Sequence, residues 1–149
     1  MANFAVQLNR TASASASLGT IGADATRPRR GKWYDLILGS EAAAADNPFL
    51  YIVQRCTALG TSTAVTPIAL DPADAATESD AGENHTIEPT YTAGAVLLAI
   101  ALNQRATFRW VAAPGGELVY PATASNGLGI QTTTASAVAI SATVHYAEM

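Results

Sequence analysis

The stretch VAISATVHY, residues 138–146, is the part of the chain that most clearly decides its fold. Large or apolar side chains recur at every second position, and smaller or polar ones lie between them. Successive side chains of a β-strand point to opposite faces, so this alternation predicts a strand with one face in a core. The face expected to be buried consists of Val138, Ile140, Ala142, Val144 and Tyr146.

Similar patterns recur in both directions along the chain. The run 96–102 is apolar without alternation, which predicts a central strand covered on both faces. The alanines of 41–47 allow at most one helical turn, because Pro48 would end it. Turn signals stand at 60–63, 114–116 and 126–127. Further strands are predicted over 4–8, 31–38, 49–57, 64–70, 85–91, 107–112, 117–120, 128–134 and 138–146.

Many short strands with regularly spaced turns predict an all-β fold, a β-sandwich and most specifically a jelly roll. We expect two regions. Residues 1–30 would form an N-terminal strand and an extended Ser/Ala-rich arm, and residues 31–149 the sandwich domain. The arm is predicted because 10–30 is rich in small residues and would order only against a partner. Residues 71–84 are expected to be an acidic, irregular connection.

Charged residues make up only 13% of the chain, about half of the roughly 25% of an ordinary soluble domain. A surface so poor in charge indicates that neighbouring molecules cover much of it, so we expect self-association. The net charge of −4 argues against a nucleic-acid partner, since such partners call for a basic face. The candidate contact residues are the basic side chains Arg27, Arg29, Arg30, Lys32, Arg105 and Arg109.

Arg105 and Arg109 are expected to lie on one face of one strand and to form salt bridges between subunits. The N-terminus lacks the basic and apolar regions of a secretory signal. The longest apolar run, 93–102, is shorter than the ~20 residues that span a bilayer. We therefore expect synthesis in the cytoplasm and no membrane partner.

Side chains that support catalysis or metal binding are scarce in this sequence. His85 and His145 lie far apart, and His85 is expected to hydrogen-bond a nearby carboxylate in a loop. The acidic residues of 71–84 do not have the spacing of a calcium-binding loop. Cys56, the single cysteine, is expected to be a buried and inert thiol. We predict a protein that is not an enzyme, with no catalytic residues, cofactor or metal.

Two segments carry a family resemblance. LNQRATFRWVAAPGGE, residues 102–117, and KWYDLILG, residues 32–39, resemble small virion proteins of tailed bacteriophages, as does Asn126-Gly127 before a final apolar strand. The virion proteins that these segments resemble look like capsid cement, or head decoration, proteins with jelly-roll domains, and the resemblance extends over about 31–148.

The resemblance implies a non-enzymatic structural protein on the outer surface of the capsid. Its partners would be the major capsid protein and other copies of itself, with a homotrimer favoured over a homodimer. It would bridge capsomers and so stabilise the shell. The alternative is a carbohydrate-binding or host-adhesion module of a virion spike or tail. That alternative requires Trp33 or Trp110 to be exposed as a platform for a sugar ring.

Overall fold

The computed structural model describes residues 1–12, 16–133 and 137–149. These residues form strands joined by turns and loops, and none of them belongs to a helix that would cross a membrane. In chain order the strands are β1 (Ala2–Thr11), β2 (Ser17–Ala23), β3 (Gly31–Ala42), β4 (Pro48–Ala58), β5 (Thr61–Val65), β6 (Ile68–Ala69), β7 (Ser79–Ile87), β8 (Thr90–Asn103), β9 (Phe108–Val111), β10 (Leu118–Tyr120), β11 (Gly127–Thr132) and β12 (Ala139–Glu148).

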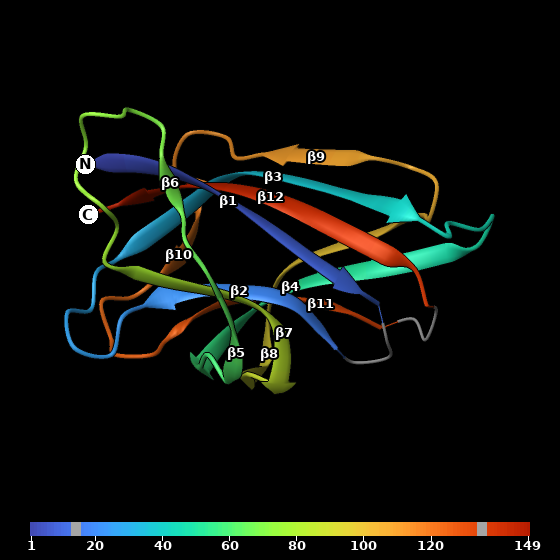
Figure 1. Cartoon of the computed structure of the whole chain (residues 1–149), viewed down its shortest axis with the longest axis horizontal. Helices are drawn as coiled ribbons and strands as arrows, with labels where there is room; N and C mark the ends of the chain where they lie inside the picture. Colours follow the sequence, from blue (N-terminus) through green and yellow to red (C-terminus); the bar gives the residue numbers. More distant parts are fainter. Residues whose placement is uncertain (13–15, 134–136) are drawn as a thin grey trace.

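The strands form two antiparallel sheets that face each other (Figure 1). Sheet A has the order β10-β3-β12-β1-β6, and β9 pairs with β3 on the same edge as β10. Sheet B has the order β5-β7-β2-β11-β4-β8. The predicted all-β sandwich is thereby confirmed.

The chain crosses repeatedly between the two sheets. β1, β2, β3 and β4 alternate between sheet A and sheet B, and β9–β10, β11 and β12 do so again on the return. The strand order that results is the double Greek-key order of a jelly roll. One sheet has β1-β12-β3 followed by β9 and β10, and the other has β2-β11-β4-β8. The excursion β5–β7 lies between β4 and β8 in sequence. Its strands β5 and β7 extend the opposite edge of sheet B, while β6 pairs with β1 in sheet A.

The core lies between the sheets, and the alternating strands supply it. On β1 and β12, Phe4 pairs with Tyr146 and Val6 with Val144, and all four side chains are buried. The Phe4 and Tyr146 rings stack with their centroids 5.4 Å apart. Each side chain of this size stabilises the fold by roughly 1.5–3 kcal/mol through burial. The face of 138–146 that the alternation predicted to be buried is buried in the structure.

The predicted N-terminal arm is wrong for residues 17–23. They form β2, in which every residue is buried, between β7 and β11 of sheet B. Its small residues reflect close packing: a Cβ at Gly19 would stand 2.7 Å from a methyl of Leu8 and 2.8 Å from the Gly82 carbonyl oxygen. Part of the Ala-Ser repeat, 13–15, lies outside the described residues.

Three other predicted boundaries also differ from the structure. Residues 41–47 form no helical turn, because β3 extends to Ala42 and Ala43 turns the chain with φ of 57°. Residues 79–84 are not an irregular connection but the first part of β7. The turn expected at 60–63 is mostly strand, since β5 begins at Thr61. In each case, pairing with a distant strand orders a segment with weak local preference.

The run 96–102 is a strand, as predicted, but not a central one. It belongs to β8, which forms the outer edge of sheet B and pairs with β4. Only Ile100 in this run is buried, while Val96, Ala99 and Ala101 are exposed. A sequence with the composition of a covered strand therefore lies at the edge of a sheet.

Candidate interface residues

The loop between β2 and β3 carries the basic run and has a defined shape. One carboxylate oxygen of Asp24 accepts hydrogen bonds from the Thr26 hydroxyl, at 2.6 Å, and from the backbone N–H groups of Thr26, at 2.7 Å, and Arg27, at 2.6 Å. These hydrogen bonds, the Thr26 hydroxyl foremost, lower the pKa of Asp24 to about 2. The ionised Asp24 side chain thereby fixes the turn that precedes the arginines.

The three arginines of this loop are exposed, but they are not equivalent. Arg27 forms an ion pair with Glu78, at 2.9 Å, which links the loop to the connection before β7. Arg29 and Arg30 take part in none of the ion pairs among the described residues. The Arg30 carbonyl accepts a hydrogen bond from the N–H of Met149, so the loop lies at the end of the sandwich that holds both termini (Figure 1).

Arg30 also lines a surface hollow of about 460 Å³ together with a second guanidinium group, that of Arg55 on β4. Arg55 donates a hydrogen bond to the Val119 carbonyl, at 2.6 Å, and forms no ion pair with a described residue. Sequence reasoning missed Arg55, although a charged residue in the apolar alternation of β4 was a signal. The hollow is completed by Val119, Pro121 and Ala122.

Lys32, the next member of the predicted basic set, lies on β3 beside β10. It pairs with Val119 in the strand ladder and is partly buried. Backbone N–H groups of Glu117 itself and of Gly115, together with the charge of Lys32, lower the pKa of Glu117. Lys32 therefore has a carboxylate nearby. In the loop between β2 and β3, the arginine loop, only Arg27 of the three arginines forms an ion pair with a described residue.

Arg109 forms an ion pair within its own chain. On the outer face of sheet A, it donates from Nε and an Nη to the two oxygens of Asp35, at 2.9 and 2.6 Å. His145 Nδ1 lies 3.2 Å from the same carboxylate, and its ring stacks on Tyr34. The hydrogen bonds from Arg109 outweigh burial and lower the pKa of Asp35. This arrangement attaches the edge strand β9 to β3.

Arg105 is not on one strand face with Arg109, which corrects that prediction. β8 ends at Asn103 and β9 begins at Phe108, so Arg105 lies in the intervening turn. Its Nε is 3.5 Å from the carbonyl oxygen of Ala44, in the connection between β3 and β4. The six predicted basic residues therefore form three separate groups rather than one patch.

His85 lies in β7, not in a loop, and its partners are not carboxylates. Nε2 lies 3.1 Å from the Leu59 carbonyl and 3.2 Å from the Thr20 hydroxyl. A carbonyl can only accept, so Nε2 carries the proton and Nδ1, which has no partner among the described residues, is a bare acceptor. Burial lowers the pKa of His85, which favours this neutral form.

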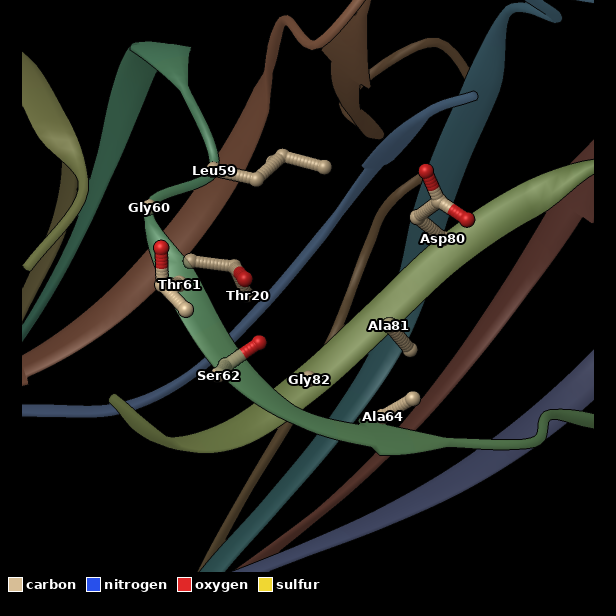
Figure 2. A pocket seen from close by; sticks show the side chains of 9 residues that line it. All are labelled: Thr20, Leu59, Gly60, Thr61, Ser62, Ala64, Asp80, Ala81 and Gly82. Atoms are coloured by element: carbon tan, nitrogen blue, oxygen red, sulfur yellow. The ribbon is translucent and has the colours of Figure 1, made fainter. Parts of the chain in front are cut away.

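Thr20 and Leu59, the two partners of His85, also line a shallow polar hollow of about 290 Å³ (Figure 2). Thr20, Ser62 and Asp80 direct oxygen atoms around it, and burial raises the pKa of Asp80. Across the described ranges no group of three His, Cys, Asp or Glu side chains is placed to hold a metal ion. The two glutamates that flank His85 in sequence bond backbone N–H groups instead: Glu83 accepts from Asn9 and Glu88 from Ser17.

A buried polar network joins the long connection before β7 to the core. Ser79 and Thr77 each donate a hydroxyl hydrogen bond to Glu148, at 2.6 and 2.7 Å. The hydroxyl groups of Tyr120 and Tyr146 contact Ser79 and Thr77, at 2.7 and 2.9 Å. Burial raises the pKa of both tyrosines, so both hydroxyl groups keep their protons. Sequence reasoning missed this network, which is built from residues far apart in the chain.

The remaining candidates belong to the interior. Cys56 is buried as predicted, and burial raises its pKa to about 11, which disfavours the reactive thiolate. Trp33 is fully buried in the core and offers no surface to a sugar ring. Trp110 is partly buried and packs against the core.

Comparisons of this chain with protein-family models, with curated proteins and with solved structures give no significant match.

Proposed function

We propose that this chain is a non-enzymatic structural protein of a virion, a capsid cement protein that binds the outer surface of a phage head. As a homo-oligomer it bridges neighbouring capsomers and stabilises the shell. Its partners are the major capsid protein and other copies of itself. Two sequence segments support the proposal through their resemblance to this class, residues 32–39 and 102–117.

One observation carries the proposal: positive charge without ion-pair partners gathers at one end of an acidic protein. The chain has a net charge of −4, yet Arg29, Arg30 and Arg55 take part in no ion pair among the described residues. Arg30 and Arg55 line the same hollow. Such a region favours an acidic partner surface, because complementary charge speeds encounter and fixes orientation.

The fold fits this role physically. Two sheets packed on a shared core make a stiff body, and a stiff body loses little conformational freedom when it docks. Each contact that exists only on the assembled shell adds binding free energy to that state alone. Shell stabilisation then follows from mass action, and it grows with the concentration of free cement protein.

The test is cosedimentation with empty shells assembled from the major capsid protein of the same virus. We expect saturable binding at low micromolar concentration, weakened by salt because the contacts are charged. Replacing both Arg29 and Arg30 with alanine should lower the affinity at least tenfold. Arg105→Ala is the matched control, since it removes an exposed arginine in a different part of the surface and should bind normally.

Absence of wild-type binding at any salt concentration would refute the proposed function. Equal losses for the double variant and for Arg105→Ala would refute the arginine loop as the contact region.

A further inference from the structure

Strand β8 leaves one side of its backbone without a partner strand. It forms the end of sheet B, and among the described residues it pairs with β4 only. It is 14 residues long and contains no charged residue. Its free edge carries a row of unpaired N–H and C=O groups, which is a template for another strand.

The other sheet edges are protected in ways that β8 is not. In sheet B the opposite edge is β5, with 5 residues. In sheet A one edge is β6, with 2 residues, which covers only Phe4 and Ala5 of β1. Residues 6–11 of β1 continue that edge, where Arg10 adds a charge and the Asn9 N–H is bonded to Glu83. The other edge of sheet A is divided into β9 and β10, with 4 and 3 residues. Short and interrupted edges are the usual protection against unwanted strand pairing. The long edge of β8 is thus an exception within its own molecule.

The regular part of β8 is the part suited to pairing. From Leu98 to Asn103 it pairs in unbroken register with Val53 to Pro48 of β4. Nearer its start the register shifts, and Gly94, with φ of 73°, marks a bulge. Bulges disturb strand pairing, so the useful edge is confined to about 98–103.

The outer face beside this edge is apolar as well. Ala99 and Ala101 are exposed, and their partners on β4, Ile52 and Leu50, are only partly buried. Val96 is 46% exposed. Pairing with another strand would therefore satisfy backbone groups and also cover apolar side chains, two gains that act together.

We propose that β8 pairs antiparallel with β8 of a second copy of this chain, so that the two B sheets join into one continuous sheet. The occupant is a second copy because a strand without charge meets its own twofold image without repulsion. A head-to-tail contact would need a second free edge without charge, and the other edges are either short or, along residues 6–11 of β1, carry Arg10 and an N–H already bonded to Glu83. The inference deepens the proposed function, on which it rests for its biological setting, by naming the subunit interface.

Light scattering on a sizing column tests this inference. We expect wild-type protein at about 50 µM to have twice the 15.3 kDa chain mass. A variant with both Ala99→Lys and Ala101→Lys should be monomeric, because the twofold would bring the lysines of the two copies together. The matched control is Ala64→Lys, at an exposed position of the short edge strand β5, and it should remain dimeric.

Hydrogen exchange gives an independent measurement if the double variant folds poorly. In the wild-type protein, amide protection within 98–103 should rise with protein concentration, while amides of β5 should not change. A wild-type monomer, a trimer, or a dimer that persists in the double variant would overturn the proposal. Protection that rises with protein concentration on a strand other than β8 would also overturn it.

The two proposals fail separately. If wild-type protein is monomeric but still binds shells, the β8 pairing is wrong and the cement function stands. If the β8 dimer forms but no shell is bound, the interface is right and the cement function is wrong.

Discussion

The edge of sheet A formed by β9 and β10 and the edge of sheet B formed by β8 occupy equivalent places in the sandwich but are built differently (Figure 1). The first is interrupted by the turn around Pro114 and carries an ion pair between Arg109 and Asp35. The second is in unbroken register from Leu98 to Asn103 and carries no charge. The difference indicates that one edge is designed to face water and the other to meet a strand.

Deletion of the N-terminal residues 1–30 should have the largest effect, because both edges depend on the strands that it removes. Deleting residues 1–30 leaves β8, β9 and β10 in the chain but removes β1 and β2, which lie inside the two sheets. We expect the shortened chain to show no cooperative unfolding transition when its circular dichroism is recorded against temperature or denaturant. A folded shortened protein would contradict the role of β2 as a core strand.

Ile100→Ala should have the next largest effect. Ile100 is the buried core side chain of β8, so its truncation should lower the free energy of unfolding by about 2–5 kcal/mol. Leu118→Ala on β10 is the comparison, and it should cost less because Leu118 is only partly buried. Urea titrations at one protein concentration measure both. Equal losses would show that the two edges are anchored alike.

Asp35→Asn tests the ion pair of the β9 edge. We expect a loss of about 1–2 kcal/mol at neutral pH, limited by the exposure of Arg109 to water. Because folding lowers the pKa of Asp35, its contribution is present above the unfolded value near 4 and disappears as pH falls through the lower folded value. Unfolding titrations between pH 2 and 7 should therefore converge for the two proteins at low pH. A constant gap would contradict this.

Two glycines give the smallest expected effect. Gly115, between β9 and β10, has φ of 82° after Pro114, and Gly94 in the β8 bulge has φ of 73°. Alanine fits the space at both positions but is strained in this conformation, so each change should cost about 1 kcal/mol. Gly94→Ala should also weaken dimer formation less than twofold, since the bulge lies outside the pairing segment. A large loss of dimer would extend the interface to the bulge.

Local patterns predicted much of the fold because a half-buried strand records its burial in its own sequence. Residues 138–146 alternate because one side of β12 faces the core along its length. Predictions failed where the partner, not the segment, decides the structure. Most residues of 17–23 are small because neighbouring strands approach closely, and the two large apolar side chains, Leu18 and Ile21, are too few to show the alternation of a strand.

The candidate contact residues follow the same division. The sequence identified Arg29 and Arg30 as unusual for an acidic chain, but it could not place Arg55 beside them or show that Asp35 binds Arg109. Those relations depend on strand pairing between distant segments.

By itself the sequence determined the class of this protein, an all-β sandwich with little surface charge, because alternation and composition are local properties. Only the tertiary structure decided that β2 is a core strand and that the apolar run of β8 lies at an edge. Strand order is fixed by long-range hydrogen bonding and by how the sheets close on one core, and neither leaves a mark on a single segment.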